Sequence, residues 1–175
     1  MDPLENIVVA GDSTYALMRE HTDRGWPVWM CTPDDLYAIE GAAWARMTPV
    51  TTHADGPPFR TQPAEERPLA DMDVVWMRKD PPFDMRYIFA TYLLDLVPPT
   101  TLVLNRPDSI RNCNEKMFAQ QWPDLSPPTL VTREIGRIKA FAAEAPGDIV
   151  IKPWDGNGGR GVLVTRHGHP NLASM

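Results

Sequence analysis

Cysteine, long apolar runs and basic residues are all scarce in this sequence. Its 175 residues include two cysteines, Cys31 and Cys113, which are too few for a disulfide framework or a zinc-finger pattern. Reduced thiols in a cytoplasmic protein are therefore expected. No apolar run approaches the roughly 20 residues that a membrane span needs, and no signal-peptide pattern opens the chain. Acidic residues outnumber basic ones by 23 to 17, and the net charge of -6 argues against a nucleic-acid binder.

Familiar catalytic and metal-binding signatures are lacking as well. The chain contains neither a Gly-x-Ser-x-Gly motif nor a Cys–His signature. His167 and His169 stand in a polar tail without a third ligand nearby, so solvated histidines are favoured over a metal pair. The candidate chemistry therefore has to come from other residue types.

The stretch from Ile149 to Val164 is the most informative part of the chain. A short β-rich apolar run leads to Lys152, and a loop with four glycines and a second β-rich run follow. Glycine has no Cβ, so the backbone N–H groups of such a loop can approach a ligand closely. Consecutive N–H groups form a concavity that suits phosphate, and Lys152 adds a positive charge at its edge. The hypothesis is a nucleotide-phosphate site, and the alternative is a plain hairpin with a floppy turn.

Two better-known phosphate loops do not fit this stretch. Residues Gly156 to Gly161 spell Gly-x-Gly-x-x-Gly, but the dinucleotide fingerprint requires a helix next, and Val162 to Thr165 predict a strand. A P-loop would end in Gly-Lys-Ser/Thr, which the chain does not supply here. What remains is a strand, a glycine-rich loop and a strand, which together resemble a flap over phosphates.

Alternating strands and helices predict an open parallel sheet for residues 1–111. Helices are expected from Ser13 towards Gly25, with Asp12 or Ser13 as the cap, and after a cap at Asp84. The second helix should bury one apolar face, made of Met85, Ile88, Phe89, Tyr92, Leu93 and Leu96. Strands are predicted at 27–31, 74–77 and 101–105, the middle one covered on both faces, and a hairpin is preferred over a helix around Glu40-Gly41.

A second unit is predicted for residues 112–175. It should contain a helix at 114–122, a strand at 129–132, an amphipathic helix at 135–142 and the glycine-rich hairpin. Lys116 would lie in the first of these helices, where a solvated surface lysine is the usual interpretation.

Arg78 and Lys79 follow a predicted parallel strand. Ligands bind at the carboxyl ends of strands in open α/β sheets, and Arg78 could receive a carboxylate or phosphate through two hydrogen bonds. The alternative is that Asp80 pairs locally and that Pro81-Pro82 only shape the entry to a helix.

Several stretches together resemble prokaryotic glutathione synthetases, members of the ATP-grasp superfamily. The resemblance covers nearly the whole chain, and its most specific part is the octapeptide Met77 to Asp84. The other stretches are Met1-Asp2-Pro3 with Asp12-Ser13, Ala90-Thr91-Tyr92, Asn105-Arg106-Pro107, Cys113-Asn114-Glu115-Lys116 and Lys152 to Gly159. The resemblance implies a Rossmann-like, pre-ATP-grasp domain on the substrate side, followed by the beginning of an ATP-grasp α+β domain that binds nucleotide.

The resemblance also implies a reaction and its site residues. The family joins γ-L-glutamyl-L-cysteine to glycine through an acyl phosphate, using ATP and Mg²⁺ (or Mn²⁺), and yields glutathione, ADP and phosphate. Lys116 and Lys152 match the two lysines that hold the phosphates, and Arg78 borders the peptide site. The flap over ATP corresponds to Gly156, Asn157, Gly158, Gly159, Arg160 and Gly161. A cytoplasmic homo-oligomer with small-molecule substrates, and without nucleic-acid or membrane partners, is implied too.

The sequence departs from the family pattern at both ends. The family chain begins with a strand before the Asp-Pro that corresponds to Asp2-Pro3, and the larger part of its ATP-grasp domain follows the segment matched here. That part carries the metal ligands, which are therefore expected beyond Met175. We expect a fragment that is inactive and poorly stable alone. A non-catalytic nucleotide- or peptide-binding module is the alternative.

Overall fold

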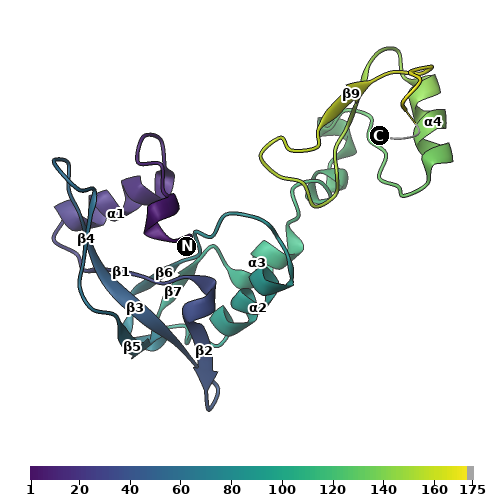
Figure 1. Ribbon diagram of the computed structural model, residues 1–175. Helices are drawn as coiled ribbons and strands as arrows, with labels where there is room; N and C mark the ends of the chain where they lie inside the picture. The colour runs from purple at the N-terminus through teal and green to yellow at the C-terminus, as the bar shows by residue number, and fades with distance from the viewer. Residues whose placement is uncertain (173–175) are drawn as a thin grey trace. The chain divides into compact units, whose positions relative to one another are not determined.

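The computed structural model describes residues 1–172. They fall into two compact units, one of residues 1–111 and one that begins at Asn112 (Figure 1). None of the helices in residues 1–172 is long and apolar enough to cross a membrane.

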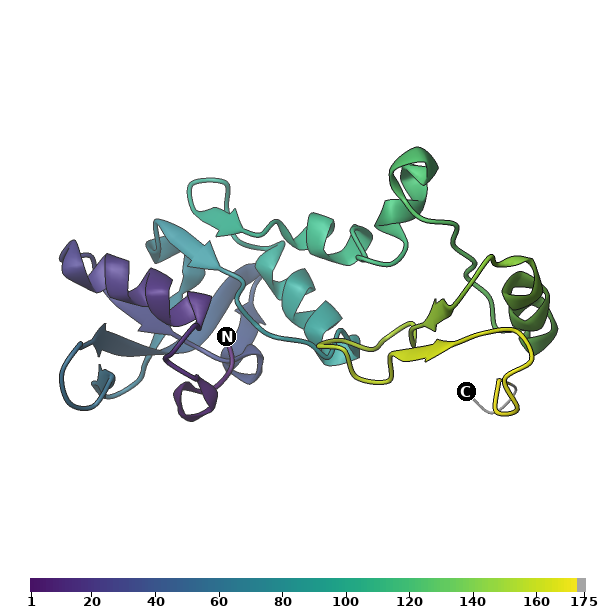
Figure 2. The ribbon, with the colours of Figure 1, turned by 90° about the horizontal axis from the view of Figure 1, so that it is seen from above.

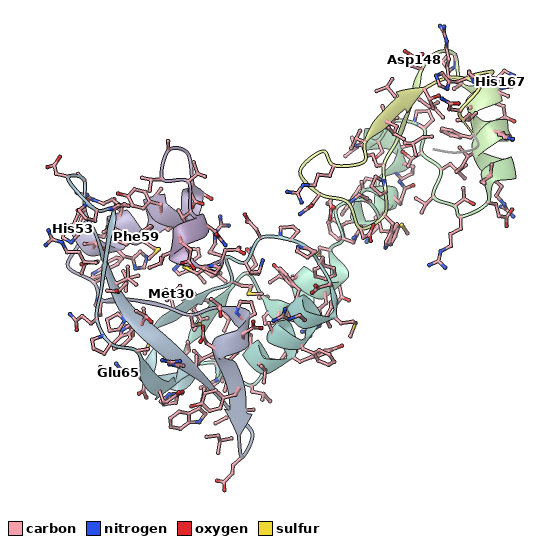
Figure 3. The ribbon with its side chains drawn as sticks, viewed as in Figure 1. Met30, His53, Phe59, Glu65, Asp148 and His167 are labelled. Carbon is pink, nitrogen blue, oxygen red and sulfur yellow. The ribbon has the colours of Figure 1, made fainter. Side chains whose placement is uncertain are left out.

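The long strand β3 (Ala42–Thr52) organises the first unit. Four other strands pair with it, all antiparallel: β1 (Val28–Met30), β2 (Leu36–Ile39), β4 (Phe59–Thr61) and β5 (Glu65–Pro68). The hairpin predicted around Glu40-Gly41 is confirmed, and both turn residues have positive φ, 49° and 81°. The turn into β4 is closed by the His53 N–H, which donates to the Pro58 carbonyl at 3.0 Å; Figure 3 shows His53 and Phe59 at this end of the sheet.

A parallel pair of strands completes the first unit. Strands β6 (Val74–Trp76) and β7 (Leu102–Leu104) pair in parallel, and helix α2 (Met85–Leu94) lies between them in sequence. The α/β class is thus confirmed, but within residues 1–172 parallel pairing is limited to this pair. Tight turns join neighbouring strands antiparallel, whereas the helical crossover allows a parallel pair. The sequence predicts that the strand at 74–77, which is β6, is covered on both faces. This prediction is wrong, because Trp76 is 40% exposed.

Local capping signals fix the starts of the two main helices. Helix α1 (Ser13–Asp23) begins after Asp12, whose carboxylate accepts hydrogen bonds from the Thr14 and Tyr15 N–H groups at 2.7 and 2.9 Å. The Asp84 carboxylate accepts one from the Tyr87 N–H at 3.0 Å at the start of α2. Side-chain oxygens thus satisfy free N–H groups of the first turn, as the sequence predicts.

The buried face of α2 differs from the prediction. The helix buries Ala90, Thr91 and Leu94, whereas Met85 and Phe89 are 59% and 58% exposed. Because Ala and Thr are small, this face can approach the sheet closely, and the larger side chains point outward. The core of the unit contains Ala43, Ala45, Met47, Leu69, Met77, Ala90 and Leu94.

The second unit contains helix α4 (Ile135–Glu144) and the antiparallel pair β8 (Ile149–Ile151) and β9 (Leu163–Thr165) (Figure 2). Its core contains Ala142, Ile149 and Leu172. Helix α3 (Pro107–Asn112) lies at the boundary between the two units in the sequence. Short 3-10 helices occur along the chain at Leu4–Asn6, Pro33–Asp35, Leu69–Asp71, Phe118–Gln121 and Pro123–Leu125.

Two expected elements of the second unit do not form. The predicted α-helix at 114–122 is a turn followed by a 3-10 helix, Phe118–Gln121. The Asn114 side chain accepts hydrogen bonds from the Lys116 and Met117 N–H groups at 3.0 and 3.2 Å, and such bonds compete with a regular helix. Residues 129–132 form no strand. No partner strand pairs with them in the described part of the chain, so their apolar pattern alone is not enough.

Candidate functional site

The glycine-rich loop connects two short paired strands. Ile149, Val150 and Ile151 of β8 pair with Thr165, Val164 and Leu163 of β9, so the loop begins at Lys152 and ends before Leu163. The strand after the loop is confirmed. This geometry excludes the dinucleotide fingerprint, which places a helix N-terminus at that point.

The tip of the loop presents backbone donors. Gly158 and Gly159 have φ of 57° and 77°, a left-handed conformation that glycine adopts readily, and a Cβ at either would meet nothing within 4 Å. Inside the loop, the Arg160 N–H donates to the Asn157 carbonyl at 3.0 Å. Within residues 1–172 the N–H groups of Asn157, Gly158 and Gly159 donate no hydrogen bond. Successive free N–H groups in such a turn suit an anion.

Lys116 reaches the base of this loop. Its Nζ donates to the Gly156 carbonyl at 2.8 Å and to the Glu115 carboxylate at 2.7 Å, and its side chain is 20% exposed. The hydrogen bond from Lys116 lowers the pKa of Glu115. Residues 40 positions apart in the sequence are thus brought together, and an ammonium group lies beside the glycine-rich loop.

Lys152 and Arg160 are exposed cations on the loop. Neither side chain forms an ion pair or a hydrogen bond in the part of the chain that the structure describes. Both charges are therefore available to an incoming anion. Lys116 is joined to the loop at the Gly156 carbonyl.

Arg78 lies at the N-terminus of α1 in the first unit. Its Nε donates to the Thr14 hydroxyl at 3.2 Å, and its Nη2 donates to the Ser13 hydroxyl. A cavity of about 340 Å³ lies here and is lined by Met1, Asp2, Asn6, Ile7, Gly11, Asp12, Ser13, Thr14, Arg78 and Asp80. The guanidinium of Arg78 favours an anionic group such as a carboxylate, whereas the Thr14 and Tyr15 N–H groups of α1 already bond to the Asp12 carboxylate. Thr14 could not be identified as a partner of Arg78 from the sequence, because no motif marks it.

Asp2 fixes the segment that carries Arg78. Its carboxylate pairs with the Lys79 ammonium at 2.7 Å and accepts the Asp80 N–H at 2.8 Å. Burial alone would raise the pKa of Asp2, but these two hydrogen bonds outweigh burial and lower it. The ionised form is thus favoured in the folded chain.

We expect Asp2→Asn to reduce the acid sensitivity of folding. A carboxyl with a lowered pKa stabilises the fold above its unfolded-state pKa, near 3.8, and this contribution is lost as the pH falls through the folded-state value. For this partly exposed pair the contribution is about 0.5–1 kcal/mol. Urea unfolding of parent and variant at pH 7 and pH 3 measures it. A stability difference that stays the same at both pH values would contradict the expectation.

No metal centre is apparent in the described residues. Within residues 1–172 no three His, Cys, Asp or Glu side chains are grouped so that they could hold a metal ion. Asp148 and His167 lie at the same end of the second unit (Figure 3), and the His169 Nδ1 accepts the Asn171 N–H at 3.3 Å.

Comparison with known proteins identifies the family. Residues 1–111 match the model of the prokaryotic glutathione synthetase N-terminal domain, and residues 115–175 match that of the prokaryotic glutathione synthetase ATP-grasp domain. Glutathione synthetases of Pseudomonas syringae pv. tomato and Pseudomonas putida are 45% and 43% identical over 99% of this chain. One from Escherichia coli K12 is 42% identical over 98%. The chain spans about half the length of these relatives, 54% to 55%. The chain belongs to the prokaryotic glutathione synthetase family.

Proposed function

We propose that this chain provides the peptide-side unit and the phosphate-binding hairpin of a glutathione synthase. The reaction joins γ-L-glutamyl-L-cysteine to glycine with ATP and yields glutathione, ADP and phosphate. The observation that carries the proposal is the Lys116 ammonium beside a glycine-rich loop whose tip has three N–H groups that donate no hydrogen bond within residues 1–172. The family membership of both units supports it.

The chemistry requires two anionic groups to be held. A carboxylate oxygen of the dipeptide attacks the terminal phosphorus of ATP and displaces ADP. The glycine amine then attacks the acyl carbon, loses a proton and displaces phosphate. Lys116, Lys152 and Arg160 would lower the repulsion between these charges, and the loop N–H groups would bind phosphate oxygens.

Within residues 1–172 no three His, Cys, Asp or Glu side chains are grouped, and the family resemblance implies that the ligands for Mg²⁺ lie beyond Met175. The part that this chain would play in the reaction is therefore to bind and orient the anionic groups. The second candidate is a non-catalytic module that binds nucleotide or peptide, and the loop N–H groups and the cavity at Arg78, which can hold anions without any reaction, favour it. Small-molecule partners, a homo-oligomeric assembly and a cytoplasmic location stay predictions of the family resemblance.

Turnover distinguishes the two candidates. The experiment measures phosphate release with ATP, γ-glutamylcysteine and glycine, using the polypeptide encoded by the reading frame that contains this sequence. Release that depends on all three substrates supports the synthase. Nucleotide binding without any release supports the module. For the 175-residue chain alone, we propose that ATP with Mg²⁺ raises the thermal midpoint little and that no turnover occurs.

We expect Arg78→Met to raise the KM for γ-glutamylcysteine by about 10-fold or more, because a charge-assisted hydrogen bond contributes about 1.5–3 kcal/mol. Met keeps the apolar stem and removes the guanidinium. Initial rates at varied dipeptide and saturating ATP give the KM. Arg133→Met, an exposed change in the second unit, serves as the matched control. An unchanged KM in Arg78→Met would show that Arg78 does not bind the dipeptide.

A further inference from the structure

The ring of Pro153 lies close to two glycines of the glycine-rich loop, Gly156 and Gly161. A Cβ added at Gly161 would lie 3.0 Å from the Pro153 Cγ. A Cβ added at Gly156 would overlap the same Cγ and lie 3.1 Å from the Arg160 carbonyl oxygen. Gly156 and Gly161, five positions apart in the loop, thus both lie against the same proline ring.

Gly156 differs from the other glycines of the loop. Gly158, Gly159 and Gly161 have positive φ, whereas Gly156 does not, so its backbone conformation does not require glycine. The lack of a side chain at Gly156 is explained by space alone, since the Pro153 ring occupies the volume where a Cβ would be.

The position of Gly156 also determines the position of the Lys116 ammonium group. The Gly156 carbonyl accepts the hydrogen bond from Lys116 Nζ at 2.8 Å. At its other end the lysine backbone is held by the Asn114 side chain, which accepts the Lys116 N–H at 3.0 Å. A shift of Gly156 away from Pro153 would therefore move or release the ammonium group.

We propose that Pro153 is a positioning residue of the phosphate site. The Gly156 N–H donates to the Pro153 carbonyl at 3.3 Å, and the ring of Pro153 limits how Gly156 can lie against it. The Gly156 carbonyl in turn holds the Lys116 ammonium beside the loop N–H groups that donate no hydrogen bond within residues 1–172. This role rests on the proposed function, in which Lys116 binds nucleotide phosphate. Pro153 itself touches no substrate.

The first test is a double-mutant cycle on ATP affinity in the polypeptide encoded by the full reading frame. We expect Gly156→Ala to weaken ATP binding by about 10-fold and Pro153→Ala by about 3-fold, with the double variant close to Pro153→Ala rather than at the product of about 30-fold. Removal of the ring relieves the more severe of the two contacts that the new methyl group would make, and the remaining contact with the Arg160 carbonyl oxygen at 3.1 Å requires a shift of a few tenths of an ångström. Effects that multiply would overturn the proposal.

Gly158→Ala provides the matched control for this cycle. It also adds one methyl group to the loop, but a Cβ at Gly158 meets nothing within 4 Å. Its effect comes from its φ of 57°, so it should combine with Pro153→Ala multiplicatively. Rescue of Gly158→Ala by Pro153→Ala would mean that the ring acts through general loop flexibility, which contradicts the proposal.

The second test separates positioning from a merely structural role. In a Lys116→Met background, Pro153→Ala should weaken ATP binding no further, because the ammonium that the ring positions is gone. A further loss of about 3-fold, equal to that in the parent, would show independent action and overturn the proposal. A parent that binds no ATP would instead refute the proposed function itself, and the two failures are thus distinguishable.

Discussion

Replacement of Lys116 or Lys152 by methionine is expected to lower kcat/KM for ATP by about 10²–10³-fold, the usual effect of removing one group that stabilises transition-state charge. Methionine is similar in length to lysine but carries no charge. Lys116 is 20% exposed and lies at the loop, so its charge acts where water is partly excluded. Initial-rate kinetics with varied ATP at saturating dipeptide and glycine measure the effect.

Lys139→Met is the control for both lysines, because Lys139 is an exposed residue of α4 and its loss changes the net charge equally. Its kinetics should match those of the parent. Near-normal constants for both the Lys116 and Lys152 variants would refute the assignment of the loop as a phosphate site. A large effect in only one of them would restrict the site to that lysine.

The largest expected effect on stability comes from Leu69→Ala. Leu69 is 2% exposed and packs in the core of the first unit with residues of β3 and α2. Truncation of a buried leucine leaves a cavity and costs about 2–5 kcal/mol of the free energy of unfolding. Urea unfolding followed by tryptophan fluorescence measures the loss. For a domain of this size the variant is expected to be partly unfolded near 37 °C.

Leu125→Ala removes the same atoms from a residue that is 86% exposed, and it should change the free energy of unfolding by less than about 0.5 kcal/mol. If Leu69→Ala were as mild as this control, the core around Leu69 would not support the fold as the structure indicates. The pair therefore tests burial rather than side-chain chemistry.

Features governed by neighbouring residues could be predicted from the sequence. The caps at Asp12 and Asp84, the turn at Glu40-Gly41 and the strand after the glycine-rich loop all depend on contacts within a few residues. For the same reason the loop could be proposed as an anion site before its conformation was known.

Features governed by distant residues could not be predicted. Nothing near Val28 in the sequence specifies that β1 pairs with β3 at Val50. Which face of α2 is buried depends on which of its side chains fit against the sheet. Lys116 contacts the backbone carbonyl of Gly156. Because every residue has such a carbonyl, the sequence cannot indicate which one the lysine contacts. Such pairings arise from packing of the whole unit.

The central place of β3 has a consequence for how the first unit opens. All four antiparallel neighbours bond to this one strand, between Ala42 and Thr52. Residues 42–47 of β3 pair with β2 and β5, and residues 48–52 pair with β1 and β4, so opening of either half must release two strands at once. The amide hydrogens of β3 should therefore exchange with solvent deuterons more slowly than those of the short outer strands, which can exchange by local fraying.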